Sequence, residues 1–214
     1  MTSALQPFDQ TERAGAAIRA KLAENPQILV VCTGNICRSP MGEVVLKARI
    51  AEQGLEYTVS SCGVSAEEQG NPIYPPAARV LRENGYVVPQ RRARRASVQD
   101  LRGSGLILAM TVGHARSLKS MCEQAGVPLD RVHLWREFDG TTALVPAGCF
   151  GDGGVLADEG DSQRSRRGYS DFYSSGGKHD VPDPWYTGDF DQTFEIVEAG
   201  AVGILNVLRR SETI

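Results

Sequence analysis

The sequence predicts an α/β fold built on a four-stranded parallel sheet with helices on both faces. Two apolar runs without polar alternation, "ILVVC" at 28–32 and "GLILAM" at 105–110, are typical of strands that are buried on both sides. Such runs alternate along the chain with helical patterns, which favours right-handed crossovers and a parallel sheet. The chain has 214 residues, which is enough for one substantial hydrophobic core.

An amphipathic helix is expected ahead of the first strand. Asp9 and Glu12 have the spacing of a capping box, and apolar residues then recur at helical spacing. We interpret residues 1–26 as an N-terminal helical extension. The expected apolar face of its helix consists of Ala14, Ile18 and Leu22.

The strand at 28–32 leads through a turn into a second predicted helix. Ser39 is the expected N-cap of this helix and Pro40 its first residue, because serine and proline favour these two positions. Gly54 is expected to end the helix. Its expected buried face consists of Val44, Val45, Ala48 and Ala51.

The alternation of strands and helices continues toward the C-terminus. Further strands are predicted at 57–63, 105–110 and 131–135, and further helices at 75–85, 111–126 and 191–210. A basic stretch, "QRRARRAS" at 90–97, leads into the strand at 105–110. The last helix has one continuous apolar face, formed by residues 194, 197, 201, 204, 205 and 208.

Residues 140–180 do not follow this alternation. They are rich in glycine, serine and charge and show no sustained period, and loops of this length are usually functional or disordered. We therefore expect a single domain over 27–214 that carries an inserted flexible loop at 140–180. Two interpretations of the loop stay open: a mobile flap with partner contacts through Tyr169, Phe172 and Tyr173, or a disordered segment.

The composition argues against nucleic-acid binding and against a membrane span. The formal net charge is −3 and the sequence pI is about 5.7, which gives no global basic field to neutralise phosphates. No run approaches the ~18 apolar residues of a membrane helix. The N-terminus lacks the basic and apolar regions of a signal peptide, so we expect a cytoplasmic protein.

The five cysteines are expected to be thiols, because their number is odd and their spacing uneven. Cys32 and Cys37 suggest zinc only weakly, since no second Cys/His pair at ligand spacing follows. We expect no metal and no cofactor. Cys62 and Cys122 are expected to lie in the core, whereas Cys149, in the inserted loop, supports no interpretation.

Residues 31–40, "VCTGNICRSP", have the features of an anion-binding loop. They lie between a buried strand and a helix N-terminus, where backbone N–H groups can converge on an anion. Gly34 allows a close turn, Asn35 tolerates the left-handed backbone region, and Arg38 offers a planar fork to two phosphate oxygens. A cysteine at the base of such a cradle is stabilised as a thiolate, so Cys32 is the candidate nucleophile.

Ser39 follows the arginine and is placed to donate a hydrogen bond to the sulfur of Cys32. This hydrogen bond would hold the thiolate and ease its departure as a leaving group. The expected phosphate-binding and loop-support residues are Thr33, Gly34, Asn35, Ile36, Cys37 and Ser39.

"VCTGNICRSP", with "GE" after it, resembles the signature of the low-molecular-weight protein tyrosine phosphatases. The resemblance continues through "SSCGVS" at 60–65, "GNP" at 70–72, "RRAR" at 91–94 and "DPWY" at 183–186. It covers about residues 27–139 and 181–210, and therefore excludes the N-terminal helix and the inserted loop at 140–180.

The resemblance implies hydrolysis of phosphotyrosine through a cysteinyl phosphate on Cys32, with Arg38 binding the phosphate. It assigns Asp183 as the general acid and then the general base, although an Asp-Pro pair is also a common turn. It places Trp185 and Tyr186 on the wall of an aromatic substrate slot, where plain packing is the alternative. The expected partner is a phosphotyrosine-containing protein or a small aryl phosphate, and the expected assembly is a monomer or a weak dimer.

Some positions within the resemblance carry more specific expectations. Ile36 stands where phosphoarginine-selective relatives carry threonine, which favours phosphotyrosine. Arg91 replaces the family histidine that braces the loop asparagine, so support of the loop is expected to differ. Glu67 and Glu68 stand near a position where many relatives carry an aromatic residue, and they are either rim residues that disfavour acidic peptides or ordinary solvated charges.

Cys37 is either a small buried residue or a redox partner of the nucleophile, as the resemblance implies. Two rival functions also stay open. Arsenate reduction on the same kind of loop would need resolving thiols, and Cys122 and Cys149 do not form the expected pair. A phosphotyrosine- or anion-binding module without catalysis is suggested by Arg91, but it leaves the presence of Asp183 unexplained.

Overall fold

The computed structural model describes residues 7–158 and 177–209. Its four strands form one parallel sheet in the order β2-β1-β3-β4, which confirms the predicted fold class. The strands are β1 Gln27–Cys32, β2 Thr58–Gly63, β3 Leu106–Ala109 and β4 Val132–Leu134.

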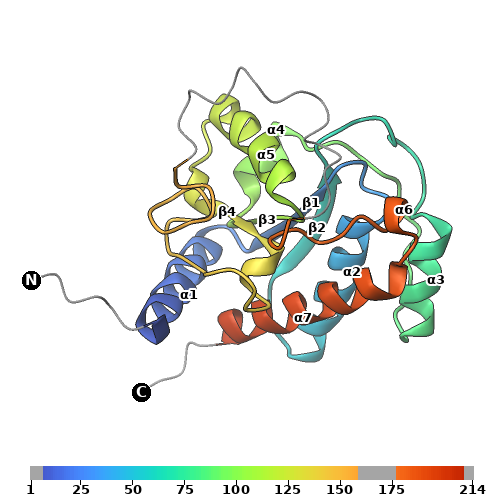
Figure 1. Cartoon of the computed structure of the whole chain (residues 1–214), viewed down its shortest axis with the longest axis horizontal. Helices are drawn as coiled ribbons and strands as arrows, with labels where there is room; N and C mark the ends of the chain where they lie inside the picture. Colours follow the sequence, from blue (N-terminus) through green and yellow to red (C-terminus); the bar gives the residue numbers. More distant parts are fainter. Residues whose placement is uncertain (1–6, 159–176, 210–214) are drawn as a thin grey trace, which may run out of the picture.

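Helices cover both faces of the sheet (Figure 1). The α-helices are α1 Pro7–Glu24, α2 Arg38–Glu52, α3 Pro75–Glu83, α4 Val98–Gly103, α5 Val112–Ala125, α6 Pro184–Thr187 and α7 Phe190–Arg209, and two 3-10 turns are η1 Leu129–Arg131 and η2 Trp135–Glu137.

Alternate residues of the central strand face different layers. Ile28 and Val30 of β1 belong to the core formed with α1, α2, α3 and α7. Leu29 and Val31 belong to the core formed with α4 and α5. All four side chains are fully buried, which explains why the sequence of β1 shows no polar alternation.

The order of the strands determines where a ligand can bind. β1 lies between β2 and β3, so the chain leaves β1 toward one side of the sheet and later returns to its other side. In open parallel sheets a crevice forms at such a switch point, beyond the carboxyl ends of the strands. Residues 32–38 lie at this end of β1, between the strand and α2.

The N-terminal helix belongs to the core rather than to a separate unit. Ala14, Ile18 and Leu22 are buried as predicted, and α1 contacts α7 and β3. The helix begins at Pro7, so Asp9 lies in its first turn and the prediction of Asp9 as a cap was wrong.

The start and the buried face of α2 differ from the prediction. The helix begins at Arg38 with Cys37 at the N-cap position, so Ser39 lies inside its first turn, where its hydroxyl contacts other partners described below. Val44 and Val45 are buried as predicted, whereas Ala51 is exposed, because the stripe that α2 packs between the sheet and α7 does not extend to it. That stripe includes Met41, Val45, Leu46 and Ile50.

The short helix α4 was missed in the basic connection before β3. Its signal is present in the sequence, because Ser97 and Asp100 form a capping box in which Ser97 accepts from the Asp100 N–H. Six residues are too few for a visible apolar period.

The described part of the inserted loop packs against the domain. Val145, Cys149 and Leu156 are buried, and the Cys149 N–H donates to the Val132 carbonyl at 2.9 Å. Cys149 is therefore a core residue. Tyr169, Phe172 and Tyr173, which were considered for partner contacts, lie outside the described residues.

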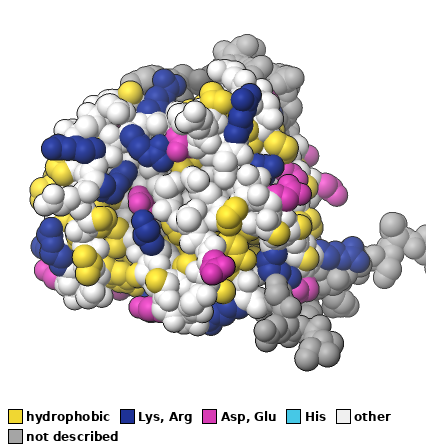
Figure 2. All heavy atoms as spheres, turned by 180° about the vertical axis from the view of Figure 1, so that it is seen from behind, with side chains coloured by type: hydrophobic (Ala, Val, Ile, Leu, Met, Phe, Trp, Pro, Cys, Tyr) yellow, Lys and Arg dark blue, Asp and Glu magenta, His cyan; other side chains and the backbone are white. Residues whose placement is uncertain are grey.

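The surface seen from behind carries lysine, arginine, aspartate and glutamate side chains interspersed with apolar ones (Figure 2). Of the helices that the structure describes, none has the length and apolarity needed to cross a membrane.

Candidate active site

Residues 32–38, here called the phosphate loop, connect β1 to α2 under tight steric limits. Asn35 has φ +62°, the left-handed region that asparagine tolerates better than most residues. The Val64 and Ser65 N–H groups donate to the carbonyls of Cys32 and Thr33 at 2.9 and 3.1 Å. A Cβ on Gly63 would lie 2.4 Å from the Thr33 carbonyl oxygen, so the end of β2 can approach the loop only as glycine.

Hydrogen-bonding groups of the loop surround the Cys32 thiol, which is 3% exposed. Its sulfur lies 3.0 Å from Ser39 Oγ and accepts from the Asn35 N–H at 3.3 Å. Ser39 thus lies against the sulfur as predicted, although not as a helix cap. Both groups can donate a hydrogen bond to an anionic sulfur, and such charge-assisted hydrogen bonds are stronger than neutral ones.

Asn35 is fully buried and connects the loop to β2. Its side-chain amide donates to Ser39 Oγ and to Ser61 Oγ, each at 2.8 Å. Ser61 in turn donates to a carboxylate oxygen of Glu43 at 2.6 Å. Ser61 and Glu43 were not predicted as site residues, because β2 and α2 bring them together only in the folded chain.

Arg91, which stands where the resemblance leads us to expect a histidine, contacts the loop asparagine directly. One guanidinium nitrogen donates to the Asn35 backbone carbonyl at 3.2 Å, and the other donates to the Asn35 side-chain oxygen. The same arginine lies 3.6 Å from a Glu43 oxygen. Burial lowers the pKa of Arg91, and Glu43 opposes that shift. The expectation of a different loop support is thus matched by a bidentate arginine.

Arg38 and Asp183 meet at the cavity although 145 positions separate them in the chain. A guanidinium nitrogen of Arg38 lies 2.5 Å from an Asp183 carboxylate oxygen, and both side chains are nearly buried. The other guanidinium nitrogen donates to the Val181 carbonyl at 3.4 Å. Asp183 is also the N-cap of α6 and accepts from the Trp185 N–H at 3.2 Å.

His114 is a buried residue of the site that the sequence analysis missed. It is fully buried near the start of α5, and its Nε2 lies 2.8 Å from the Thr33 hydroxyl oxygen. That oxygen accepts from Arg38 at 3.3 Å. Burial, and secondly Arg38, lower the pKa of His114 well below its ordinary value. Nothing in the local sequence signals this contact, which depends on the crossover after β3.

A cavity of about 330 Å³ opens above the phosphate loop. Trp185 and Tyr186 border it with 52% and 58% of their surfaces exposed, and the Trp185 ring packs 4.9 Å from the ring of Tyr74. Asn35 and Ser39 lie behind the cavity and do not line it. The lining residues are Cys32, Thr33, Gly34, Ile36, Cys37, Arg38, Glu67, Glu68, Asp183, Trp185 and Tyr186.

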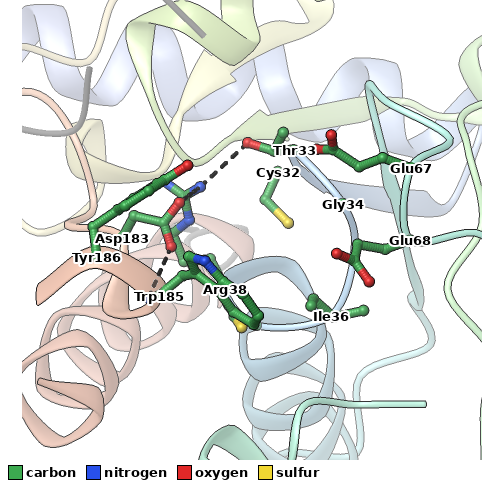
Figure 3. Close-up of a pocket in the computed structure, with 11 residues that line it drawn as sticks. Cys32, Thr33, Gly34, Ile36, Arg38, Glu67, Glu68, Asp183, Trp185 and Tyr186 are labelled. Atoms are coloured by element: carbon green, nitrogen blue, oxygen red, sulfur yellow. Dashed lines mark hydrogen bonds and ion pairs between the residues drawn. The ribbon is translucent and has the colours of Figure 1, made fainter. Parts of the chain in front are cut away.

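Glu67 and Glu68 form the wall opposite Asp183 and Tyr186 (Figure 3). A Cβ on Gly34 would lie 2.6 Å from Glu68 Cγ, so the Glu68 side chain runs directly over the loop. Its carboxylate accepts from Asn71 at 2.6 Å. The phosphate loop therefore forms the floor of the cavity, and Glu67 and Glu68 make part of its rim acidic.

All five cysteines are buried and none of them forms a disulfide. Cys62 and Cys122 lie in the core as predicted. Cys37 lines the cavity, and burial followed by the nearby Cys32 raises the pKa of its thiol. Among residues 7–158 and 177–209, no group of three or more His, Cys, Asp or Glu side chains is arranged to hold a metal ion.

The arrangement joins a thiol, a guanidinium and a carboxyl group in one cavity. A thiolate at the base of an anion cradle can attack the central atom of a bound oxyanion. A carboxyl group across the cavity can transfer a proton to or from the departing or entering oxygen.

Comparison with known proteins agrees with this chemistry. The family model described as low molecular weight phosphotyrosine protein phosphatase matches residues 27–145. The chain is 30% identical over 191 residues to a low molecular weight protein-tyrosine-phosphatase of Streptomyces coelicolor, covering 86% of this chain and 93% of that one. It is also 33% identical over 111 residues to the protein-arginine-phosphatase of Bacillus subtilis, covering 52% of this chain and 71% of the relative.

The fold is shared with solved structures of the same group. The crystal structure of YfkJ from Bacillus subtilis superposes with a TM-score of 0.64 at 26% identity, covering 87% of this chain and 96% of that one. The residues that match the family model include β1, the phosphate loop and α2. The chain therefore belongs to the low-molecular-weight phosphotyrosine protein phosphatase family.

Proposed function

We propose that this phosphatase hydrolyses phosphotyrosine, in proteins or as small aryl phosphates, through a covalent phosphoenzyme on Cys32. The observation that carries the proposal is the position of three groups around one cavity. The Cys32 sulfur lies at the base, Arg38 lies beside it, and Asp183 lies 2.5 Å from that guanidinium.

In the first step, the Cys32 thiolate attacks the phosphorus and the bond to the tyrosine oxygen breaks. Arg38 binds two of the phosphate oxygens, which compete with Asp183 for the same guanidinium N–H groups. The protonated Asp183 carboxyl then donates its proton to the leaving phenol oxygen.

In the second step, Asp183 acts as a base. It takes a proton from a water molecule, which attacks the phosphorus of the cysteinyl phosphate. The sulfur–phosphorus bond breaks, the Cys32 thiolate is restored, and inorganic phosphate leaves.

Ser39 supports both steps because its single proton has two partners. The hydroxyl lies 3.0 Å from the Cys32 sulfur and 3.3 Å from the Cys62 carbonyl oxygen, while its oxygen accepts from Asn35. A thiolate cannot donate, so the Ser39 proton turns to the sulfur whenever Cys32 is the anion or the leaving group.

The substrate class follows from the walls of the cavity. Trp185 and Tyr186 offer aromatic surface to a phenol ring, and Ile36 replaces the threonine of phosphoarginine-selective relatives. The arginine phosphatase among the relatives makes phosphoarginine the alternative to test. Arsenate reduction has less support, because Cys62, Cys122 and Cys149 are in the core layer of α4 and α5.

The experiment compares wild type, Cys32→Ser and Cys122→Ala on p-nitrophenyl phosphate and on peptides with phosphotyrosine, phosphoarginine or phosphoserine. Cys122→Ala removes a buried thiol outside the cavity and should keep activity. Cys32→Ser should lose at least about 10⁴-fold in kcat. Activity that survives Cys32→Ser contradicts the mechanism, a wild type without activity favours an anion-binding module, and preferred turnover of phosphoarginine contradicts the substrate class.

A further inference from the structure

His114 is connected to the catalytic arginine through a single hydroxyl group. Its Nε2 lies 2.8 Å from Thr33 Oγ1, and Thr33 Oγ1 accepts from the same Arg38 nitrogen that contacts Asp183. Figure 3 shows Thr33 and Asp183 on different sides of the guanidinium, each with a dashed line to it. Arg38 is thus held between a carboxylate from the C-terminal part of the chain and a hydroxyl of its own loop.

The surroundings of His114 fix the ring and its proton. Thr111, the N-cap of α5, accepts from the His114 backbone N–H at 3.1 Å and lies 3.0 Å from ring Nδ1. A neutral imidazole carries one ring proton. Because Arg38 is positive, the favoured tautomer directs the Nε2 lone pair toward Thr33 and Arg38 and leaves the proton on Nδ1, where it is donated to Thr111.

This tautomer gives the Thr33 hydroxyl a defined direction. Its proton is donated to His114 Nε2, and its lone pairs face Arg38. A hydroxyl that donates a hydrogen bond becomes a better acceptor for the next donor. The hold on Arg38 through Thr33 therefore persists when Asp183 is protonated and its ion pair with Arg38 is lost.

We propose that His114 is a positioning residue that holds Arg38 in its phosphate-binding orientation through the hydroxyl of Thr33. The proposal rests on the proposed function, in which Asp183 must release Arg38 during the reaction. It assigns a role to a buried histidine that does not touch the substrate.

The experiment measures phosphate affinity separately from turnover. The dissociation constant of inorganic phosphate is determined by calorimetry for wild type, Thr33→Val, Thr33→Ser, His114→Ala and the double variant Thr33→Val/His114→Ala. We expect a loss of about 10- to 150-fold in Thr33→Val, the range for one hydrogen bond to a charged group, and a loss of up to the same size in His114→Ala. Thr33→Ser keeps the hydroxyl and should bind as wild type does.

The double variant tests whether the two residues act as one unit. Its loss should be no larger than that of the weaker-binding single variant, because the second substitution removes a contact that is already broken. Losses that multiply, or equal affinity in Thr33→Val and Thr33→Ser, would overturn the proposal. If His114→Ala does not fold, equal affinity in Thr33→Val and Thr33→Ser still overturns the proposal, because His114 acts only through the Thr33 hydroxyl.

His133 provides the matched control. It is also a fully buried histidine, but it pairs with Glu137 at 2.7 Å and does not line the cavity. His133→Ala should lower stability and leave phosphate affinity unchanged. If His133→Ala loses as much phosphate affinity as His114→Ala, the loss in His114→Ala comes from general destabilisation and the proposal is contradicted. A wild type that binds phosphate but hydrolyses none of the substrates would contradict the proposed function and leave this test intact.

Discussion

Around the Cys32 thiol, the phosphate loop is held by a buried network of neutral amide and hydroxyl groups that ends at the Glu43 and Arg91 pair. Around Arg38, it is held by an ion pair with Asp183 and by Thr33. The thiol side is fixed by elements that surround β1, whereas the guanidinium side needs a residue that follows the inserted loop. We infer that the thiol side keeps one arrangement, whereas Arg38 exchanges Asp183 for phosphate when phosphate binds.

The largest effect on the guanidinium side is expected from Asp183→Asn. Loss of the proposed general acid and base should lower kcat by about 10²- to 10⁴-fold. The loss should be greater for phenyl phosphate than for p-nitrophenyl phosphate, because p-nitrophenolate needs less help from a proton. Steady-state kinetics with both substrates check this.

Asp189→Asn is the control, since Asp189 is an exposed acidic residue six positions further along the chain. It should keep normal activity. Equal losses for the two substrates in Asp183→Asn would mean that Asp183 acts only by holding Arg38.

On the thiol side, Arg91→Ala should lower kcat/KM by about 10-fold. The substitution leaves the Asn35 backbone carbonyl and side-chain oxygen without the guanidinium, and a lost charged hydrogen bond costs about this factor. Arg91→Lys should not restore activity, because an ammonium group cannot reproduce the paired contacts of the planar guanidinium. Full activity in Arg91→Lys would show that only charge is needed.

Arg92→Ala is the neighbouring control. Arg92 is exposed and donates to the Gly70 carbonyl, so its removal should change kcat/KM by less than about twofold. A similar loss in both variants would contradict a specific role for Arg91.

These two sides also differ in how much of them the sequence could predict. Cys32, Arg38 and Ser39 belong to one short signature, and Asp183 could be added by its Asp-Pro motif. Ser61 and Glu43 lie in the "SSCGVS" and "GE" segments of the resemblance, but the hydrogen bonds that join Asn35, Ser61 and Glu43 depend on how β2 packs beside α2. His114 could not be predicted, because it reaches the loop through the crossover after β3.

The fold was more predictable than the details of its helix ends. The apolar runs predict β1 and β3 well, because strands buried on both sides have few alternatives. Ser39 was assigned as a cap from its residue type, but its hydroxyl contacts Cys32 and Asn35 instead. The packing of residues 145–156 depends on contacts with the edge of the sheet that a glycine-rich sequence does not reveal.

On the guanidinium side, the buried His114 should make the stability of the protein depend on pH. Burial keeps its pKa well below 6.5 in the folded protein, with Arg38 as the second cause, whereas the unfolded chain binds a proton near pH 6.5. The unfolded state therefore gains protons first as the pH falls. The free energy of unfolding should decrease below about pH 6.5, with up to about 1.4 kcal/mol per pH unit from this residue.

Urea unfolding between pH 7 and pH 5 measures this slope. His114→Gln should lower this slope by the contribution of about one proton. Thr33→Val leaves the imidazole buried and should keep the wild-type slope. An unchanged slope in His114→Gln would show that other groups cause the pH dependence.

The smallest expected effect concerns the acidic rim. Glu67 and Glu68 face the substrate side of the cavity, so phosphopeptides with lysine or arginine next to phosphotyrosine should be preferred over those with aspartate or glutamate. The double variant Glu67→Gln/Glu68→Gln should reduce this preference by about 2- to 5-fold, and added salt should do the same.

Glu24→Gln removes one exposed acidic residue at the end of α1, outside the cavity, and should leave the ratio of kcat/KM values unchanged. If the ratio of kcat/KM for basic and acidic phosphopeptides is the same in Glu67→Gln/Glu68→Gln as in wild type, Glu67 and Glu68 are ordinary solvated charges without a role in specificity.

The most direct measurement is the identification of the covalent intermediate. Asp183→Asn, in which water attack should be slow, is mixed with p-nitrophenyl phosphate, quenched in acid and digested, and the peptides are analysed by mass spectrometry. We predict one added PO₃ group on the peptide that contains Cys32, located on the Cys32 sulfur. Continued release of p-nitrophenol without this adduct, or an adduct on another residue, would contradict the account.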